Sequence, residues 1–431
     1  MPDALVIVGG LLQTSFGSRR LDILVKEGLI AEIGESGSLL GRGEVIDASD
    51  ALVMPGFVDI QVHFRTPGGE ESEDIVTGAA GAALGGVTAC VMMPNTVPTI
   101  DNVELVNDVL RLGARTPCDV RTSAAITVDR LGERLVDFPK LYASGVRVFT
   151  DDGTVVDDPV LMEGALQATA NMPGAVISQH AEESTMVEGG VINEGAVSQR
   201  LGLKGRPSEA EAVIVQRDIA LAAKTGGRYH VLHMSTAEAT HLVRSAKAAG
   251  TRVTSEVTPQ HLVLTEEDVE RLGSSGKMNP PLRTGDDVAA LRAGLLDKTI
   301  DAIATDHAPH SAEAKAVGLV DAPPGMLGVE TMASVVWSEL VVPGFLSAEQ
   351  FVFLLSHSPA RIADIVEHGG ELQIGDPAHL TVFDPKDEWI VSASTLQSKS
   401  VNTPWPNKQL TGRVRHTICR GALVVQNGVL V

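Results

Sequence analysis

The stretch FVDIQVHFR at residues 57–65 predicts a buried β-strand whose last residues are polar. Its first half is mostly apolar, as in a strand that is covered on both faces. Because side chains alternate in direction along a strand, Gln61, His63 and Arg65 are expected to point the same way. This strand therefore carries chemically active groups at the end where it leaves the sheet.

Seven further short buried runs follow downstream. With the first they give eight predicted strands, at residues 57–64, 87–93, 120–127, 146–150, 175–180, 229–234, 252–257 and 302–305. Stretches rich in Ala, Leu and Glu, which are typical of helices, lie between them at residues 101–112, 208–224 and 236–249. Eight β-then-α units over roughly 300 residues favour an α/β fold of the (β/α)8 TIM-barrel type over an open doubly wound sheet.

Both ends of the chain look different from this middle part. Short β-type runs separated by turns occupy residues 5–8, 21–25, 29–33 and 45–47, and again 380–383, 417–419 and 422–425. Asn427-Gly428 before residues 429–431 suits a tight hairpin turn. We therefore predict a small β-sandwich domain built from both termini, residues 1–53 and 366–431, around a barrel at residues 54–365.

The composition excludes several kinds of partner. The formal net charge is -21 and only 3% of the residues are aromatic, which disfavours binding to nucleic acid or to an anionic membrane. The first residues lack a basic and apolar leader pattern, and no run of about 18 apolar residues occurs. Three widely spaced cysteines do not suggest a disulfide framework. We expect a cytoplasmic protein that acts on a small molecule.

Imidazole and carboxylate side chains recur where the predicted strands end. They are His63 after the first strand, Asp151 and Asp152 after the fourth, His180 and Glu182 after the fifth, His230 and His233 at the sixth, and Asp306, His307 and His310 after the eighth. In a barrel these strand ends lie together. A single histidine there is most often a packed residue, but five strands that share the pattern indicate a catalytic divalent ion such as Zn²⁺.

A set of motifs then identifies a family. They are PGFVDIQVHFR at 55–65, MPNT at 93–96, FTDDG at 149–153, HAE at 180–182, HMST at 233–236, KMNPPLR at 277–283 and ATDHAPH at 304–310. Together they resemble the class I dihydroorotases of the amidohydrolase superfamily, and the match runs through essentially the whole chain. The resemblance implies a distorted barrel with a binuclear zinc centre. It also implies the reversible hydrolysis of the cyclic amide of L-dihydroorotate to N-carbamoyl-L-aspartate in de novo pyrimidine (UMP) biosynthesis.

The resemblance also implies a role for individual residues. One metal would be held by His63 and Asp306 and the other by His180 and His233. Asp152 would bridge the two ions, with Asp151 as the alternative. Asp306 would serve as general base and acid for the activated water. Substrate would be bound by His63, Arg65, Asn95, Asn279, His310 and the backbone at Pro324 and Gly325.

Gln61 departs from this pattern, because the family has His-x-His where this chain has Gln-x-His. An amide oxygen is a weaker zinc ligand than an imidazole nitrogen, so the occupancy of the second metal position stays open. One interpretation is a working dihydroorotase that tolerates Gln61, or that carries it as an engineered change. The alternative is an inactive paralogue that serves as a structural partner of aspartate carbamoyltransferase. The persistence of the other ligands favours the enzyme.

Another cyclic amidase, of the hydantoinase or allantoinase kind, is the third interpretation. Such enzymes bridge their metals with a carboxylated lysine on the fourth strand, and residues 145–152 contain Arg147 but no lysine. Arg65 and Asn95 also favour a substrate that bears a carboxylate. The sequence leaves open whether the chain forms a homodimer or associates with an aspartate carbamoyltransferase.

Overall fold

All eight predicted barrel strands are present in the computed structural model, which describes residues 4–431, so the first three residues of the predicted segment 1–53 lie outside it. The strands are β7 (Phe57–Val62), β8 (Val87–Met92), β9 (Asp119–Thr122), β10 (Val148–Phe149), β11 (Val176–Gln179), β14 (Tyr229–Val231), β15 (Val253–Val257) and β16 (Ala302–Ile303). Each begins within two residues of its predicted start, but several end earlier than predicted. Their last residues leave the ladder to form the loops above the barrel.

The barrel is distorted because its strands form two groups. One group has the parallel order β7-β8-β9 and the other has β10-β11-β14-β15-β16. Single parallel bridges join the groups, Ala124 with Phe149 on one side and Val62 with His307 on the other. The strands therefore close into a ring, and their carboxyl ends share one rim, as in other (β/α)8 folds.

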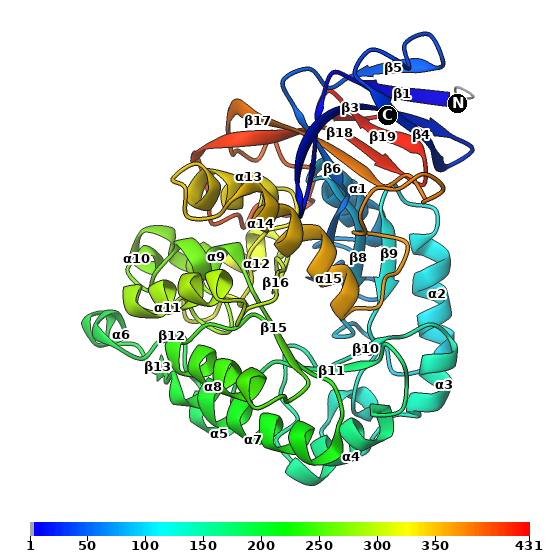
Figure 1. The fold of residues 1–431 in the computed structure, drawn as a ribbon. Coiled ribbons are helices and arrows are strands. Elements are labelled where there is room, and N and C mark those ends of the chain that lie inside the picture. Colours follow the sequence, from blue (N-terminus) through cyan, green and yellow to red (C-terminus); the bar gives the residue numbers. More distant parts are fainter. Residues whose placement is uncertain (1–3) are drawn as a thin grey trace.

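Helices surround this ring on the outside (Figure 1). The predicted helices at 101–112, 208–224 and 236–249 correspond to α2 (Val103–Gly113), α7 (Glu209–Thr225) and α8 (Ala237–Ala248). The remaining helices are α1 (Ile75–Leu84), α3 (Phe138–Ala143), α4 (Pro159–Thr169), α5 (Ser184–Val187), α6 (Ala196–Leu201), α9 (Pro259–Val263), α10 (Asp268–Leu272), α11 (Gly285–Leu296), α12 (Ala312–Ala316), α13 (Met332–Val336), α14 (Ala348–Val352) and α15 (Ser358–Ile362). Two short strands, β12 (Ile192–Asn193) and β13 (Gly205–Arg206), pair within the long loop after β11.

Strands from the two ends of the chain form one mixed sheet beside the barrel, at the top of Figure 1, where both termini also lie. Its strands are β1 (Ala4–Val8), β2 (Leu11–Thr14), β3 (Gly17–Lys26), β4 (Leu29–Glu35), β5 (Glu44–Asp47), β6 (Leu52–Pro55), β17 (Leu380–Ile390), β18 (Gln409–Cys419), β19 (Ala422–Gln426) and β20 (Val429–Leu430). Antiparallel pairing of β6 with β17 joins the two halves. Asn427 (φ 51°) and Gly428 (φ 73°) form the predicted hairpin turn.

Strands β2 and β6 and the full length of β17 and β18 are not among the runs predicted from the sequence. Both long strands contain register shifts, so the alternation of apolar and polar residues breaks within them. The fold class, a distorted barrel with a β-sandwich part from both termini, is confirmed. The domain bounds at residues 53 and 365 stay a prediction.

Apolar side chains fill much of the interior of the barrel. Val58, Ile60 and Ala89 pack inside the ring, and Ile362 of α15 packs against the same cluster. A separate apolar cluster fills the terminal sheet, with Ile7 and Leu380 among its members. The interior of the barrel is therefore a packed core, and the polar groups gather at the carboxyl ends of the strands.

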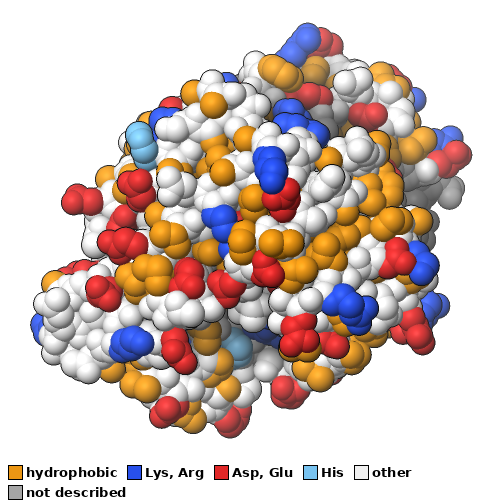
Figure 2. Space-filling model, turned by 90° about the horizontal axis from the view of Figure 1, so that it is seen from below, with side chains coloured by type: hydrophobic (Ala, Val, Ile, Leu, Met, Phe, Trp, Pro, Cys, Tyr) orange, Lys and Arg blue, Asp and Glu red, His pale blue; other side chains and the backbone are white. Residues whose placement is uncertain are grey.

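The described surface carries charges of both signs. Figure 2 shows acidic, basic and apolar side chains interspersed over one face of the molecule. This mixed surface, with the net charge of -21, offers little to a polyanion. Within residues 4–431, no helix combines the length and the apolar character needed to cross a membrane.

Candidate active site

The predicted ligands converge on Asp152, which follows β10. Nε2 of His63 lies 3.2 Å from Oδ2 of Asp152, Nδ1 of His180 lies 3.5 Å from Oδ1, and Nε2 of His233 lies 3.4 Å from Oδ1. Nε2 of His63 also lies 2.9 Å from Oδ1 of Asp306. Five different strand ends thus bring three imidazoles and two carboxylates together, and all five side chains are buried.

The neighbouring Asp151 faces another way. Its Oδ1 accepts hydrogen bonds from the backbone N–H groups of Ile126 (2.7 Å) and Thr127 (3.0 Å), and its Oδ2 accepts one from the Thr127 hydroxyl. These contacts fasten the loop after β10 to the loop after β9. Of the two adjacent aspartates, only Asp152 lies among the histidines.

The donor set fits metal ions. Nδ1 of His180 and Nε2 of His233 face each other at 2.9 Å, and a cation beside Asp152 would give both lone pairs a partner. The site contains two groups of three donors that share Asp152, namely Asp152, His180 and His233, and His63, Asp152 and Asp306. Imidazole nitrogens with carboxylate oxygens are donors that suit Zn²⁺ and related divalent ions.

The electrostatics of the site favour a positive charge. Burial alone would lower the pKa of His63, but hydrogen bonds with Asp152 and Asp306 outweigh it and raise that pKa to about 9. The pKa of His180 is raised to about 9 in the same way, against burial, by Asp152 and Glu182. Protons are therefore held where a divalent cation would replace them.

Outer partners fix the tautomer of two of these histidines. Nδ1 of His63 lies 2.8 Å from Oδ1 of Asn95, which directs Nε2 toward Asp152 and Asp306. Nε2 of His180 lies 3.1 Å from a carboxylate oxygen of Glu182, which directs Nδ1 inward. Hydrogen bonds of this kind orient metal-binding imidazoles and raise their basicity.

Glu182 is itself held by arginines. Its two oxygens accept hydrogen bonds from Nε (3.2 Å) and Nη2 (2.7 Å) of Arg206, and Nη2 of Arg283 lies 3.9 Å away. Burial raises the pKa of Glu182, but His180 and Arg206 outweigh burial and lower it well below its ordinary value. The carboxylate is therefore ionised and fixed beside His180.

Three residues at the rim have an uncommon backbone. Arg65 (φ 54°), His233 (φ 31°) and Asp306 (φ 48°) all lie in the left-handed region. Non-glycine residues adopt this conformation infrequently, and functional sites are among the places where they do. At these positions the turn directs the side chain into the site just after the strand ends.

Gln61 lies two residues before His63 and makes no hydrogen bond with the predicted ligands. Its side chain is completely buried, and neither its Oε1 nor its Nε2 has a hydrogen-bond partner among residues 4–431. It is also not one of the side chains that line the cavity above the cluster. A buried amide without partners costs free energy, so the side chains around Gln61 leave its amide poorly satisfied.

The cluster forms the floor of a cavity of about 270 Å³. Every other residue predicted for metal or substrate lines it, namely His63, Arg65, Asn95, Asp152, His180, His233, Asn279, Asp306, His310, Pro324 and Gly325. Oδ1 of Asn279 is buried and has no hydrogen-bond partner within the described chain. An acceptor of this kind suits an N–H group of a bound molecule.

Arg65 and His310 form one wall of the cavity. Nε of Arg65 donates to the Pro309 carbonyl (3.3 Å), and its Nη2 lies 3.4 Å from Nε2 of His310. That nitrogen of His310 also lies 2.8 Å from the carbonyl oxygen of Pro324. Burial and the charge of Arg65 lower the pKa of His310 to about 3, so His310 is neutral beside the guanidinium.

Arg130 is a cavity residue that sequence reasoning missed. It lies in a turn after β9 with φ 57°, and its Nε donates to the carbonyl of Asp151 (3.3 Å). It lines both the inner cavity and a wider adjoining chamber. No motif marked this arginine, because its turn follows a short strand and contributes no metal-type ligand.

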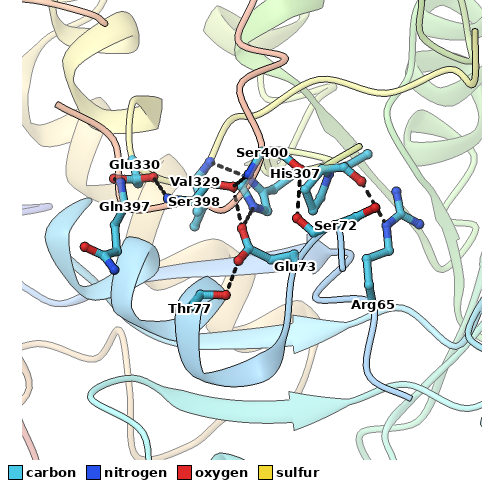
Figure 3. Close-up of polar contacts among 12 residues, drawn as sticks. Arg65, Ser72, Glu73, Thr77, His307, Val329, Glu330, Gln397, Ser398 and Ser400 are labelled. Atoms are coloured by element: carbon cyan, nitrogen blue, oxygen red, sulfur yellow. Dashed lines mark hydrogen bonds and ion pairs between the residues drawn. The ribbon is translucent and has the colours of Figure 1, made fainter. Parts of the chain in front are cut away.

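His307, next to Asp306, connects the site to a second buried carboxylate (Figure 3). Its Nδ1 accepts from the backbone N–H groups of Gly328 (3.2 Å) and Val329 (3.4 Å), so its Nε2 carries the proton and faces Glu73 at 3.7 Å. Its carbonyl accepts from the N–H of His63 (2.9 Å). His307 thus packs behind the site and supports the backbone of a predicted ligand.

A further group of metal-type side chains lies at the junction with the terminal sheet. It consists of Asp119, His368 and His379. Nε2 of His368 lies 2.8 Å from Asp119, which also pairs with Arg420, and the two imidazoles stack with ring centroids 3.6 Å apart. These side chains already have hydrogen-bond or ion-pair partners, which indicates a structural contact and not a metal site.

Comparisons with known proteins agree with this geometry. A family model described as Dihydro-orotase-like matches residues 50–239. The dihydroorotase of Mycobacterium tuberculosis is 41% identical over 426 residues, which cover 98% of this chain and 99% of the relative. The dihydroorotase of Leifsonia xyli is 44% identical over 432 residues, covering 100% and 98%. The chain belongs to the dihydroorotase family.

Solved structures of related cyclic amidases share the fold of this chain. The L-hydantoinase (dihydropyrimidinase) of Arthrobacter aurescens matches it with a TM-score of 0.89 at 27% identity, over 100% of this chain and 98% of that one. The dihydropyrimidinase of Brevibacillus agri has the same fold, with a TM-score of 0.87 at 23% identity and coverage of 99% and 96%. The predicted membership of the amidohydrolase superfamily is confirmed. The higher identity to dihydroorotases favours that family over the other cyclic amidases.

Proposed function

We propose that this chain catalyses the reversible hydrolysis of L-dihydroorotate to N-carbamoyl-L-aspartate, a step of de novo pyrimidine biosynthesis. One observation carries the proposal: a single cavity combines a cation-binding cluster around Asp152 with an anion-binding wall at Arg65. A cyclic amide that bears a carboxylate needs both. The names of the relatives at 41–44% identity support the same substrate.

The metal-binding residues are proposed in two sets. His180 and His233 hold one ion and His63 and Asp306 the other, with Asp152 between them, and Zn²⁺ is the proposed metal because its preferred donors are present. When bound, the ions supply a Lewis acid for the amide carbonyl and lower the pKa of the attacking water. The distances from Asp152 to three imidazoles support its assignment as the bridging carboxylate.

The remaining cavity residues bind and orient the substrate. Arg65, Asn95 and His310 are proposed to hold the substrate carboxylate, since a guanidinium recognises it through paired hydrogen bonds. Asn279 and the backbone at Pro324 and Gly325 are proposed to hold the amide and carbonyl groups of the ring. The free Oδ1 of Asn279 supports this assignment. Fixing the ring at both ends would hold the scissile carbonyl in one orientation within the cavity.

Asp306 is the proposed general base and acid. Its carboxylate lies on the cavity floor, 2.9 Å from Nε2 of His63. In that position it can take a proton from the attacking water and deliver it to the ring nitrogen as the C–N bond breaks. In the reverse direction the same carboxylate returns the proton.

Gln61 is the observation that favours a second candidate, a catalytically inactive partner of aspartate carbamoyltransferase. In that case the barrel would be kept for binding another protein. The complete set of other ligands and the intact cavity support the enzyme instead.

The test measures dihydroorotate hydrolysis, carbamoyl-aspartate cyclisation and metal content in the wild-type protein and in Gln61→His, with Asp306→Asn as the inactive control. We expect activity in the wild type and a higher metal content in Gln61→His. If both proteins bind metal and neither turns over substrate, the enzyme proposal fails. If only Gln61→His is active, Gln61 is the inactivating residue. That result would support the inactive partner of aspartate carbamoyltransferase.

Partners and location are proposed as well. A homodimer, or a complex with aspartate carbamoyltransferase, is a prediction that sedimentation of the chain alone and with the transferase would check. A cytoplasmic location is proposed from the three buried cysteines, which are free thiols.

A further inference from the structure

A segment of the C-terminal part crosses from the terminal sheet to the rim of the barrel. We call residues 397–403, between β17 and β18, the strap. The backbone N–H groups of Gln397 (2.7 Å) and Ser398 (3.1 Å) donate to Glu330, as Figure 3 shows. The hydroxyl of Ser400 donates to the carbonyl of Ser72 (2.7 Å). The strap therefore touches the loops that follow the first and the eighth barrel strands.

Asn402 is the strap residue that reaches the cavity wall. It is 2% exposed. Its Nδ2 donates to the carbonyl oxygens of Ala308 (3.0 Å) and Gly325 (3.0 Å), and its Oδ1 accepts from the N–H of His310 (3.2 Å). Its own carbonyl accepts from the N–H of Leu327 (3.1 Å). Both amide protons and the amide oxygen are thus used, all on backbone groups of the rim.

The three side-chain partners of Asn402 all line the cavity. Ala308 and His310 flank Pro309, whose carbonyl accepts from Nε of Arg65. Gly325 follows Pro324, whose carbonyl lies 2.8 Å from Nε2 of His310. One buried amide therefore joins two rim segments, 308–310 and 324–325, which carry the proposed contacts for the substrate carboxylate.

The strap is anchored beside this amide by packing. Trp405 is buried in an apolar cluster that contains Met278 and Met326. These two residues are the sequence neighbours of the cavity residues Asn279 and Gly325. The packing of Trp405 thus fixes the position of Asn402. A side chain that orients other residues must itself be held in place.

We propose that Asn402 is a positioning residue that sets the geometry of the carboxylate-binding wall. This inference rests on the proposed function, because it assigns a role in binding the carboxylate of that substrate. Asn402 lines no part of the cavity itself and acts through the backbones of Ala308, His310 and Gly325. A short amide suits the position, since it supplies two donors and one acceptor from a planar group.

Substitutions of Asn402 should disturb its three backbone partners in different ways. In Asn402→Asp a carboxylate oxygen would replace Nδ2 and face two carbonyl oxygens, which repels both rim segments without a change of volume. In Asn402→Ala the two carbonyls and one N–H lose their partners, a loss that buried backbone groups tolerate poorly. Ser400→Ala is the matched control, because it removes a hydrogen bond from the same strap to Ser72, which does not line the cavity.

The experiment compares the metal-loaded wild type with these three variants. It measures KM and kcat for dihydroorotate, Kd for orotate by calorimetry, metal content, and the melting temperature. We expect KM and Kd to rise about tenfold in Asn402→Ala and further in Asn402→Asp. We expect kcat to stay within threefold and the metal content to stay unchanged, because no proposed ligand contacts Asn402. Ser400→Ala should keep the wild-type KM.

Two results would overturn the inference. One is an active wild type whose KM and orotate Kd change less than twofold in both Asn402 variants. The other is a joint fall in kcat, metal content and melting temperature, which is expected if the substitution only impairs folding. The variant Asn402→Ser keeps one polar atom and would show whether KM recovers in a folded protein. If the wild type binds orotate but does not hydrolyse dihydroorotate, the proposed function is wrong. The change in the Kd for orotate in the Asn402 variants then still tests the inference. Absence of orotate binding would sink both.

Discussion

Nε2 of His180 lies 3.1 Å from a carboxylate oxygen of Glu182, two residues further along the same loop, so Nδ1 of His180 faces Asp152 and His233. The contact joins a proposed metal ligand to a buried carboxylate that Arg206 holds from the other side. The imidazole is thereby fixed before a metal arrives.

Removal of this carboxylate should weaken metal binding. We expect Glu182→Ala to lower the metal affinity about 10- to 100-fold, the usual loss when the partner of a metal-binding histidine is removed. Glu182→Gln should lose less, since its amide oxygen still accepts from Nε2. Competition with a chelator measures the affinity, and the exposed Glu188→Gln is the control for the same change of charge. Affinities within twofold of the wild type in Glu182→Ala would contradict the role.

Substitution of the two adjacent aspartates should have opposite effects on metal binding. Asp152→Asn is expected to abolish tight binding of both ions, because both donor groups include Asp152. Asp151→Asn should keep the metal but lose about 1–3 kcal/mol of stability, since three buried donors of Ile126 and Thr127 lose an ionised acceptor. Metal analysis and denaturant unfolding of the two variants separate these effects. Loss of metal from Asp151→Asn would reverse the assignment.

The metal-free protein should lose stability as the pH rises. The pKa of His180 in the folded chain is about 9, above the ordinary value of 6.5, because hydrogen bonds with Asp152 and Glu182 outweigh burial. The stabilisation from the extra proton is fully present below about pH 6.5 and is lost as the pH rises through about 9. Melting temperatures of chelator-treated protein should therefore fall across this window, while metal affinity rises because protons no longer compete.

A histidine variant provides the control for that titration. His241 is exposed and lies far along the chain on α8, so His241→Gln should keep the pH dependence of the wild type. His180→Gln should weaken it, and the remaining pH dependence should come from His63, whose pKa is also raised to about 9. A metal-free protein whose melting temperature is constant from pH 6.5 to 9.5 would rule out the proposed proton.

Arg130 should contribute to substrate capture. Its guanidinium lines the same cavity as Arg65, and we expect Arg130→Met to raise KM for dihydroorotate three- to tenfold with a smaller change in kcat. The exposed Arg134→Met changes the net charge equally and should leave KM unchanged. Steady-state kinetics at two salt concentrations would show whether the effect is electrostatic. An equal effect of both variants would assign it to net charge alone.

Much of the barrel and of the site can be predicted from the sequence because both follow local rules. Each buried strand is a compact apolar run, and a residue within three positions of its end enters the site, as with His63 after β7 and Asp306 after β16. The predicted cavity residues, apart from Gln61, do line one cavity.

The features that were missed depend on contacts made far along the chain. Asn402 lies 94 residues from Ala308 in an irregular segment, and its contacts are to backbone atoms, so neither periodicity nor residue type marks it. The choice between Asp151 and Asp152 needed the orientation of a single peptide after β10. Arg130 depends on a left-handed turn that its side chain does not reveal.

The crossing of Asn402 to the rim has a consequence for how the protein is made. The ribosome synthesises His63 long before Asn402, and β6 likewise waits for β17 before the two halves of the terminal sheet can pair. The proposed carboxylate-binding wall is therefore completed later in synthesis than the cluster around Asp152, so a nascent barrel would assemble its proposed metal ligands before it could bind an anion.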